Sequence, residues 1–349
     1  MSNLIIDPIT KIYSRYTNNQ NEILKLKLTN LYNCANVQIT NSGLHSNYIA
    51  LEIATKLNPD YNIIYINELY HESIEIIKLF NKSDNIYMID INNNLSYDNL
   101  LTNNQIINKY NILFIESCTN PNGYIFDYIL IDKLKNISSK LIVICDNSWL
   151  TNHIFNPFDY DIDIITISLT KYYSGGNAIC GGCIIKDNTL FEQFDKYIRI
   201  SGIHISQLQT SIINQYIDQT LERLTKQSLN TLSIIKYISE SELYRNNNII
   251  INHPSVKTHI AYDNAIKYFK NNLYPSTFTI GFNINKEKLT LIINNLKIFN
   301  IETSFGSKLT IIDNYIFNLN NYSYIRISIG YNDSIEYIKS GIDELLNFI

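Results

Sequence analysis

The sequence lacks the features of membrane, secreted and nucleic-acid-binding proteins. It has no long uncharged apolar run that could form a spanning helix. Its opening "MSNLIIDPITKIYSR" has no basic segment followed by an apolar stretch, so we expect no signal peptide and a cytoplasmic protein. An excess of positive charge is also missing, because the formal net charge is -4. This balance gives no electrostatic reason to expect nucleic acid or an anionic membrane as a partner.

Cysteine gives no support for a zinc or redox centre. The cysteines are odd in number, at Cys34, Cys118, Cys145, Cys180 and Cys183. Cys180 and Cys183 form a CxxC, but no second pair and no histidine cluster accompanies them, and a tetrahedral zinc site needs four ligands. We therefore expect free, mostly buried thiols and no bound metal.

Arginine is rare beside lysine. It occurs at Arg15, Arg199, Arg223, Arg245 and Arg326. The planar guanidinium of arginine binds a carboxylate through two parallel hydrogen bonds, which lysine cannot do. In a chain that mostly uses lysine, arginine is therefore expected where a carboxylate must be bound by two parallel hydrogen bonds.

Short β-branched runs alternate with helical stretches up to about Leu221. The strand candidates are "NVQIT" (36–40), "NIIYIN", "NIYMIDI", "NILFIES", "KLIVIC" and "DIITIS". Such nearly continuous apolar runs are typical of buried parallel strands, so the pattern predicts an α/β fold with helices on both faces of a mostly parallel sheet. Beyond Leu221 come a long helix, "YPSTFTIGFNI", "KEKLTLIINNLK", "YIRISIG" and an amphipathic helix over 334–349. We expect a second domain there, with helices on a small mixed sheet.

Polar residues follow several of these strands, where open α/β sheets bind their ligands. In "ITNSGLHS" a strand ends near Gly43 and a helix begins at about Leu44, which would offer backbone N–H groups and a helix dipole to a phosphate. Asp146 directly follows the strand in "LIVICDNSW", either to meet a cationic group or to cap a helix. Asn120 precedes Pro121 in "ESCTNP", where it either marks a turn or places a polar side chain in the ligand crevice at the strand ends.

Lys171 follows the strand "DIITIS" within segments that read as buried, and Ser168 and Thr170 flank it. An anion cradle, a carboxylate for a pyridinium nitrogen, an amide near a phenolic oxygen and a buried lysine are the groups that pyridoxal phosphate requires of a protein. The sequence therefore predicts this cofactor. Lys171 would bind its aldehyde as a Schiff base, and Ser168 and Thr170 would add hydroxyl donors to its phosphate.

These motifs, in this order, resemble those of the Cys/Met-metabolism family of pyridoxal-phosphate enzymes nearly end to end. The family's Asp-Asn-Thr run followed by Ser-x-Thr-Lys-Tyr reads here as "DNSWLTNHIFNPFDYDIDIITISLTKYYSGG". The other matches are "YSR" (13–15), Ser42-Gly43-Leu44, "ELYHES" with Tyr70, "ESCTNP", "TSFGSK" with Ser304 and "YIRISIGYND" with Arg326.

The resemblance implies roles for individual residues. Lys171 would hold the cofactor and move protons at the substrate's Cα, and Asp146 would keep the cofactor's ring nitrogen protonated. Tyr70 would stack on the ring and assist proton transfer, while Asn120 would approach its phenolic oxygen. The residues implied for the phosphate are Gly43, Leu44, Ser168 and Thr170, with Tyr13 and Arg15 reaching it from a neighbouring subunit. Those implied for the amino-acid substrate are Arg326, which would clamp its carboxylate, Ser304 and Tyr13.

The resemblance also implies fold type I, with a mostly parallel seven-stranded sheet in a large domain and a smaller C-terminal α+β domain. We place a short N-terminal arm at 1–20, the cofactor domain at 21–218 and the C-terminal domain at 219–349. The implied assembly is a homodimer or a homotetramer with active sites shared between subunits, and the short arm leaves both open. Gly176 and Ala178 replace a His and an Asp of the family pattern, which leaves open a changed specificity or a weakened activity.

Three residues favour one reaction within the family. Glu75 stands where members acting on longer γ-substituted substrates commonly have arginine, and Trp149 and Phe305 also match the cystathionine β-lyases. We therefore expect β-elimination on cystathionine or a related cysteine thioether, giving a thiol, pyruvate and ammonia. Two alternatives stay open. One is γ-replacement or γ-elimination, as in cystathionine γ-synthase, cystathionine γ-lyase or methionine γ-lyase; the other is a catalytically inert member that serves as a binding or assembly protein.

Overall fold

The computed structural model describes residues 18–82, 84–91 and 93–349, which form two compact units. The first unit comprises the described residues up to Thr119 together with Phe126–Asp218. The second comprises Asn120–Ile125 and Gln219–Ile349. Tyr13 and Arg15, and most of the expected N-terminal arm, lie outside the described residues.

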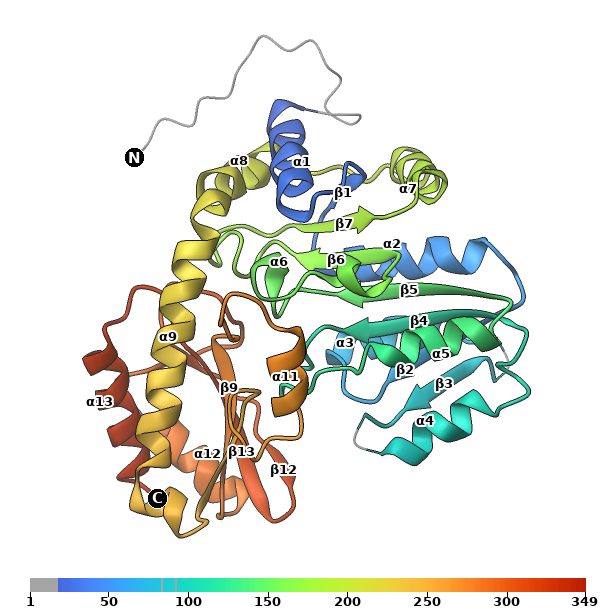
Figure 1. The fold of residues 1–349 in the computed structure, drawn as a ribbon. Helices are drawn as coiled ribbons and strands as arrows, with labels where there is room; N and C mark the ends of the chain where they lie inside the picture. Colours follow the sequence, from blue (N-terminus) through green and yellow to red (C-terminus); the bar gives the residue numbers. More distant parts are fainter. Residues whose placement is uncertain (1–17, 83, 92) are drawn as a thin grey trace. The chain divides into compact units, whose positions relative to one another are not determined.

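A seven-stranded sheet forms the centre of the first unit (Figure 1). Its strands are β1 (Val37–Thr40), β2 (Tyr61–Ile66), β3 (Ile86–Ile89), β4 (Tyr110–Glu116), β5 (Lys140–Asp146), β6 (Ile164–Ser168) and β7 (Gly181–Ile185). Their spatial order is β1-β7-β6-β5-β4-β2-β3. β7 runs antiparallel to β1 and β6, and the other neighbouring pairs are parallel. The predicted fold class, a mostly parallel seven-stranded sheet, is confirmed.

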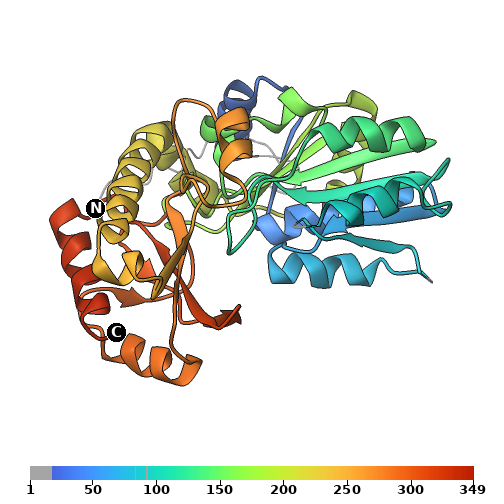
Figure 2. The ribbon, with the colours of Figure 1, turned by 60° about the horizontal axis from the view of Figure 1, so that its bottom comes forward.

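Helices lie on both faces of this sheet, which explains the apolar strands (Figure 2). They are α1 (Asn19–Tyr32), α2 (Gly43–Lys56), α3 (His71–Leu79), α4 (Asn94–Leu101), α5 (Ile129–Ile137), α6 (Thr151–Ile154), the 3-10 turn η1 (Pro157–Tyr160), α7 (Asn188–Ile200) and α8 (Gln207–Tyr216). All residues of β4 are buried, as is β5 from Leu141 to Cys145. Strands covered on both faces lose the polar–apolar alternation of a half-exposed strand.

The location of β7 was not predicted, and two glycines explain why. It begins with Gly181 and Gly182, and glycine weakens the sequence pattern of a strand. A Cβ on Gly181 would lie 2.2 Å from the carbonyl oxygen of Ser42, so the turn before α2 packs directly on the backbone of β7. Because this close approach requires glycine, the start of β7 lacks the apolar side chains that would identify a strand in the sequence.

The second unit holds a smaller mixed sheet of six strands. The strands are β8 (Ile249–Asn252), β9 (Thr277–Phe282), β10 (Asn300–Ile301), β11 (Ile311–Ile312), β12 (Phe317–Leu319) and β13 (Tyr322–Ser328). The helices are α9 (Thr220–Ser239), preceded by the 3-10 turn η2 (Ile217–Gln219), then α10 (Glu242–Arg245), α11 (Tyr262–Tyr268), α12 (Lys286–Asn295) and α13 (Ile335–Leu346). One apolar core joins Ile234 of α9, Leu289 of α12 and Ile338 of α13 to Ile280 of β9 and Ile325 of β13.

Two buried histidines make the stability of the second unit depend on pH. His259 Nε2 lies 3.0 Å from the carbonyl oxygen of Asn122, and His253 Nε2 lies 3.1 Å from that of Pro275. Burial lowers the pKa of His253 to about 3 and that of His259 to about 4, from an ordinary value of 6.5. Below pH 6.5 the unfolded chain takes up these protons before the folded unit does, so the free energy of unfolding should fall as the pH drops towards 4.

Urea unfolding of wild-type protein and His253→Gln at a series of pH values tests this expectation. Wild type should hold its full stability above pH 6.5 and lose it progressively below, whereas the variant should lose less. His204→Gln, at an exposed histidine of the first unit, is the control and should follow wild type. An equal acid loss in wild type and His253→Gln would contradict the account.

Candidate active site

Three strands of the first unit end in polar residues at one edge of the sheet. β4 ends at Glu116, β5 at Asp146 and β6 at Ser168. In the parallel register Glu116 pairs with Asp146, and Asp146 pairs with Thr166. The carboxyl ends of these strands therefore meet at the edge where open α/β sheets bind ligands.

The N-terminus of α2 reaches the same edge through a glycine. Ser42 caps the helix, because its Oγ accepts a hydrogen bond from the backbone N–H of His45 at 3.1 Å. A Cβ on Gly43 would lie 2.6 Å from the Cβ of Ser168, which is too close for two carbon atoms, so glycine is required there. The N–H groups of Gly43 and Leu44 lie in the first turn, which has no intrahelical acceptors. Together with the helix dipole they can hold an anion beside the Ser168 side chain.

Asp146 lies partly buried at the end of β5 and accepts two hydrogen bonds. Asn47 Nδ2 donates to its Oδ2, and the backbone N–H of Ser148 donates to its Oδ1, each at 2.9 Å. Burial raises the pKa of the Asp146 carboxyl, while the hydrogen bonds from Ser148 and Asn47 and the positive charge of Lys171 act in the opposite direction. The alternative of a helix cap does not apply, because α6 begins later, with Leu150 in the capping position.

Lys171 lies in a tight turn that follows β6. Its backbone N–H donates to the carbonyl oxygen of Ser168 at 3.3 Å. Thr170 Oγ1 fixes the turn, because it accepts from the N–H of Cys180 at 3.1 Å and donates to the Cys180 carbonyl at 3.2 Å. The single hydroxyl proton of Thr170 is thus directed at backbone, and a contact with a phosphate would require it to rotate. The backbone N–H of Gly176 donates to the Thr170 carbonyl at 3.1 Å. Gly176 has a φ of 82°, a left-handed conformation that glycine adopts without strain, which suits a glycine where the family pattern has another residue.

Tyr70 stands at the N-terminus of α3, and its side chain is 45% exposed. Its backbone N–H donates to Oε1 of the buried Glu116 at 2.6 Å. The carboxylate that ends β4 therefore holds the start of α3, which presents the Tyr70 ring. The motif "ESCTNP" did not reveal this role of Glu116, although the acid follows an apolar strand just as Asp146 does.

Arg326 of the second unit lies on β13, is 8% exposed and has several partners. Its Nη1 donates to Asn120 Oδ1 at 2.8 Å, and its Nη2 donates to Thr303 Oγ1 at 3.3 Å and forms an ion pair with Asp313. Asp313 is itself 7% exposed. A substrate carboxylate would therefore meet a guanidinium whose charge Asp313 already balances. The structure brings Arg326 and Asn120 together, and sequence reasoning missed Asp313.

Ser304 adopts a φ of 153°, a backbone region that is nearly restricted to glycine. It follows Thr303, whose hydroxyl also donates to Asp313 Oδ2 at 3.0 Å. A non-glycine residue in such a conformation costs roughly 1–3 kcal/mol and tends to occur at functional sites. The strain and the hydrogen bonds together single out 303–304 as part of the Arg326 cluster.

The three residues that favoured β-elimination differ in their settings. Glu75 lies exposed on α3 and forms an ion pair with Lys78 of the same helix at 2.7 Å. Trp149 and Phe305 are both buried, as is Ala178 beyond the Lys171 turn. The ion pair gives Glu75 a local partner on its own helix.

Four of the five cysteines are buried, and all five are free, as expected. Cys180 Sγ donates to the carbonyl of Thr40 at 3.2 Å and Cys183 Sγ to that of Ser46 at 3.7 Å. Burial raises the pKa of both thiols to about 12. Within residues 18–82, 84–91 and 93–349, no group of three or more His, Cys, Asp or Glu is placed to hold a metal ion. In that same part of the chain, none of the helices combines the length and the apolar character that a bilayer crossing requires.

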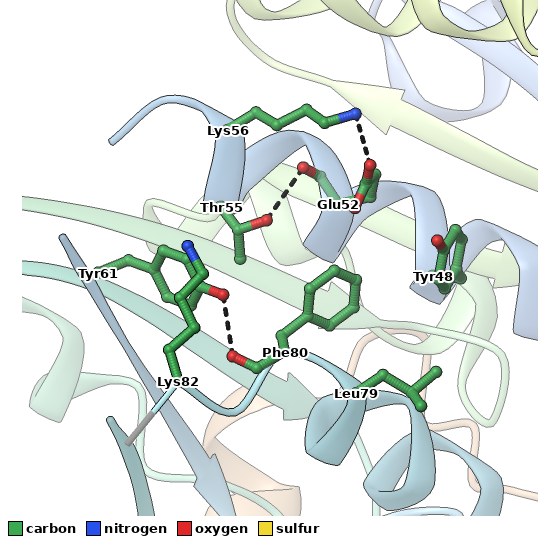
Figure 3. A pocket seen from close by; sticks show the side chains of 8 residues that line it. All are labelled: Tyr48, Glu52, Thr55, Lys56, Tyr61, Leu79, Phe80 and Lys82. Carbon is green, nitrogen blue, oxygen red and sulfur yellow. Dashed lines mark hydrogen bonds and ion pairs between the residues drawn. The ribbon is translucent and has the colours of Figure 1, made fainter. Parts of the chain in front are cut away.

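A cavity of about 390 Å³ in the first unit lies apart from these residues. It is lined by Tyr48, Glu52, Thr55, Lys56, Tyr61, Leu79, Phe80 and Lys82, from α2, the start of β2 and the end of α3 (Figure 3). Its polar groups bond to one another: Lys56 pairs with Glu52 at 2.5 Å, and Tyr61 OH donates to the Phe80 carbonyl at 2.9 Å. Among the predicted site residues that the structure describes, none lines this cavity.

The residues of the sheet edge fit pyridoxal phosphate. The glycine-dependent approach of α2 to Ser168 leaves an anion cradle of the right chemistry for the phosphate. The partly buried Asp146 needs a cationic partner, as a protonated ring nitrogen would be, and the charge of Lys171 already acts on it. The predicted cofactor residues of the first unit other than Tyr70 thus lie at the end of β5, at the end of β6, in the turn that follows β6 and at the start of α2.

Comparisons with known proteins give low identities over much of the chain. An L-alanine/L-glutamate racemase of Wolbachia pipientis is 23% identical over 53% of this chain and 46% of its own. A cystathionine beta-lyase of Neurospora crassa is 26% identical over 72% of this chain and 53% of its own. The chain thus spans about half the length of these curated relatives. The crystal structure of a cystathionine gamma synthase from Xanthomonas oryzae pv. oryzae matches with a TM-score of 0.81 at 18% identity, covering 100% of this chain and 92% of that one.

A family model matches far more of the sequence than either relative does. The match runs from residue 7 to residue 344, and the model describes the Cys/Met metabolism PLP-dependent enzymes, where PLP is pyridoxal 5'-phosphate. It includes the strand ends, the Lys171 turn and the Arg326 strand. The chain therefore belongs to the Cys/Met metabolism PLP-dependent enzyme family.

Proposed function

We propose that this protein is a carbon–sulfur lyase that performs β-elimination on cystathionine or a related cysteine thioether. The observation that carries the proposal is the position of Lys171, in the turn after β6, from which its positive charge acts on the partly buried carboxylate of Asp146 at the end of the neighbouring strand. An amine and an acid fixed on adjacent strand ends are what a family member needs to bind PLP and to use it.

The residues that would hold the cofactor come from the start of α2, the end of β5, β6 with the turn that follows it, and the start of α3. Gly43 and Leu44 would bind the phosphate by their N–H groups and Ser168 by its hydroxyl, with Thr170 joining if its hydroxyl turns from Cys180. Asp146 would pair with the ring nitrogen, and Tyr70 would cover the ring. When bound, PLP supplies an electron sink that stabilises negative charge at the substrate's Cα. Asn120, Tyr13 and Arg15 keep the roles implied by the family resemblance, and a homodimer or homotetramer is proposed on the same ground.

The chain's own contribution to the reaction is a proton relay at Lys171. Its amine would take the proton from Cα of the substrate, after which the Cβ–S bond breaks and the sulfur leaves with the bonding pair. Protonation of the sulfur gives the thiol, and addition of water to the remaining three-carbon fragment gives pyruvate and ammonia. Arg326 would bind the substrate carboxylate, and Ser304 would lie close to it. The reaction needs no oxidant or reductant.

The choice of β-elimination rests on Trp149, Phe305 and Glu75 and on the Neurospora crassa relative, which is a cystathionine beta-lyase. The runner-up is γ-elimination or γ-replacement, because another relative, from Fusobacterium nucleatum, is an L-methionine gamma-lyase at 23% identity. The ion pair between Glu75 and Lys78 favours neither reaction.

Incubation of the purified protein with PLP and cystathionine distinguishes the two reactions by their keto acids. We expect pyruvate, because abstraction at Cα followed by loss of the Cβ substituent leaves a three-carbon product. Predominant 2-oxobutyrate would show γ-elimination and overturn the choice. If protein that holds PLP on Lys171 forms neither keto acid, the alternative of a catalytically inert binding or assembly protein is favoured. Mass spectrometry of the keto-acid hydrazones gives the measurement.

A further inference from the structure

Asn47 has no role in the family motifs, yet it contacts the candidate site directly. It lies on α2, four residues after Gly43 and hence on the same face of the helix as the anion-binding turn. Its side chain is 1% exposed. One amide nitrogen, Nδ2, lies 2.9 Å from Asp146 Oδ2 and 3.2 Å from Ser73 Oγ, so its two hydrogens serve two partners. Ser73 is fully buried on α3, the helix whose N-terminus carries Tyr70.

The chemistry of this contact fits an ionised Asp146. A carboxylate only accepts hydrogen bonds, so it can be satisfied by the nitrogen of Asn47 and not by its oxygen. In the described part of the chain the buried Oδ1 of Asn47 has no hydrogen-bond partner. A buried amide oxygen without a partner lowers stability, and a leucine of similar volume would avoid that cost. The amide therefore has a reason other than packing to occupy this position.

We infer that Asn47 is a positioning residue, which holds the Asp146 carboxylate in place for the cofactor and joins it through Ser73 to the helix that presents Tyr70. The inference rests on the proposed role of Asp146 as the acid that meets the PLP ring nitrogen. Three elements then depend on one side chain: α2 supplies the anion turn and Asn47, β5 supplies Asp146, and α3 supplies Ser73.

Other groups around Asp146 decide how the site responds to pH. Lys171 acts on it from the turn after β6, and Glu116 is its neighbour in the register with β4. The charge of Asp146 in turn adds to the pKa of the Cys145 and Cys183 thiols. Burial, the larger cause, raises the pKa of Cys183 to about 12 and that of Cys145 well above its ordinary value, so both thiols stay neutral near pH 7. The charge of Lys171 acts directly on Asp146, and the carboxyl of Glu116 lies on the neighbouring strand.

The test measures the dissociation constant of PLP, by visible absorbance, for wild type and variants across a range of pH. Asn47→Leu removes the hydrogen-bond donor at nearly constant side-chain volume. It should weaken PLP binding about tenfold or more, which is the effect expected from the loss of one hydrogen bond to a charged group. Asn47→Asp places a second acid beside Asp146, so it should bind PLP more weakly still near neutral pH. It should recover as the pH falls, because the introduced carboxyl group, once protonated, can again donate to Asp146. A residue that only packs α2 would produce no such recovery.

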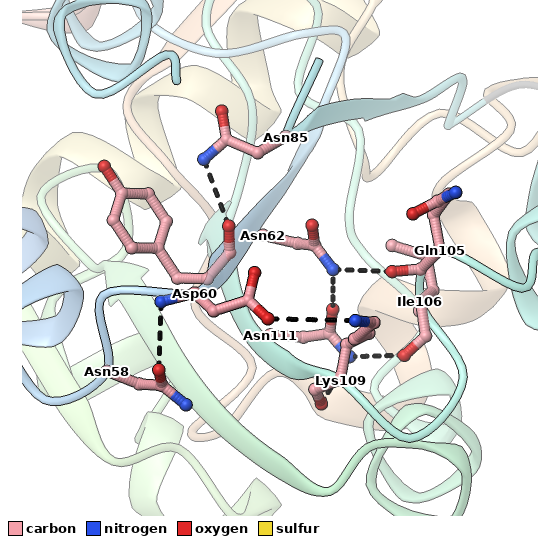
Figure 4. A network of polar contacts seen from close by, with 9 residues as sticks. Asn58, Asp60, Asn62, Asn85, Gln105, Ile106, Lys109 and Asn111 are labelled. Atoms are coloured by element: carbon pink, nitrogen blue, oxygen red, sulfur yellow. Dashed lines mark hydrogen bonds and ion pairs between the residues drawn. The ribbon is translucent and has the colours of Figure 1, made fainter. Parts of the chain in front are cut away.

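Asn62→Leu is the matched control, since it makes the same change at the opposite end of the parallel strands. Asn62 Nδ2 donates to the Gln105 carbonyl at 2.7 Å and to Asn111 Oδ1 at 3.0 Å, in the polar network shown in Figure 4. Asn62 and Asn111 lie at the starts of β2 and β4, whereas Asp146 ends β5. This variant should lower the melting temperature and leave PLP affinity unchanged. If Asn47→Leu does not fold, Asn47→Ser, which is too short to reach Asp146, carries the same expectation of weaker binding.

The outcomes separate this inference from the proposed function. If wild type binds no PLP, the proposed function fails. If wild type binds PLP and the dissociation constant of Asn47→Leu lies within about twofold of the wild-type value, the role of Asn47 is refuted while the proposed function stands. A twofold change is far smaller than the loss of one hydrogen bond to a charged group would cause. A tenfold loss in Asn47→Leu, unchanged affinity in Asn62→Leu and acid recovery in Asn47→Asp together establish it.

Discussion

Replacement of Lys171 by alanine should reduce the rate of keto-acid formation from cystathionine by at least about 10²–10⁴-fold, the usual contribution of a positioned proton-transfer group. The variant lacks both the amine that would carry PLP and the base that would take the Cα proton, so the upper part of this range or beyond is expected. The fold should survive, because the turn is held by backbone and by Thr170 rather than by the lysine side chain. Steady-state rates with saturating PLP, together with circular dichroism, give the measurement.

Lys78→Ala is the matched control for this change. Lys78 lies on α3 of the same unit, with a side chain that is 60% exposed and paired with Glu75. Its loss should leave the rate within about twofold of wild type, because an exposed ion pair contributes little. A Lys171→Ala variant that keeps most of the wild-type rate would show that the proton relay lies elsewhere.

Asp313→Ala should destabilise the second unit by about 3–5 kcal/mol, because it leaves the buried guanidinium of Arg326 without its counter-charge. Arg326 and Asp313 are 8% and 7% exposed, and Asp313 also accepts from Thr303 Oγ1 at 3.0 Å and from the N–H of Tyr315 at 3.0 Å. Several hydrogen bonds therefore lose their acceptor at once. The free energy of unfolding in urea gives the measurement.

A double variant separates the ion pair from its surroundings. In Asp313→Ala/Arg326→Met both charges are gone, so much of the lost stability should return, as is common when a buried pair is replaced by apolar side chains. A single variant that costs less than about 1 kcal/mol would mean that water reaches Arg326 and screens its charge. Stability that falls further in the double variant would contradict the account of the pair.

The sheet of the first unit was predictable because burial on both faces imposes a simple pattern. β4 and β5 carry apolar side chains at nearly every position, and such runs identify buried strands. β7 was not predicted because its first residues are glycines, which let Ser42 pack against the backbone of the strand. The two-residue strands β10 and β11 of the second unit are too short to show any period.

The candidate site was predictable where it depends on strand ends and not where it depends on packing. Asp146, Gly43 and Lys171 each lie at or just after a strand end, and parallel strands bring their carboxyl ends together. Asn47 is a helix residue whose contact with Asp146 depends on how α2 lies on the sheet, which no local pattern reveals. The pairing of Arg326 with Asp313 likewise depends on the antiparallel register of β11 and β13, in which the Asp313 N–H donates to the Arg326 carbonyl at 2.9 Å.

Borohydride reduction followed by peptide mass spectrometry tests the central claim most directly. Wild-type protein saturated with PLP should carry a single stable pyridoxyl label on Lys171, and its visible absorbance should disappear on reduction. Lys171→Ala treated in the same way should carry no specific label. A wild-type protein that stays colourless with PLP, or a label found on another lysine, would contradict the proposed site.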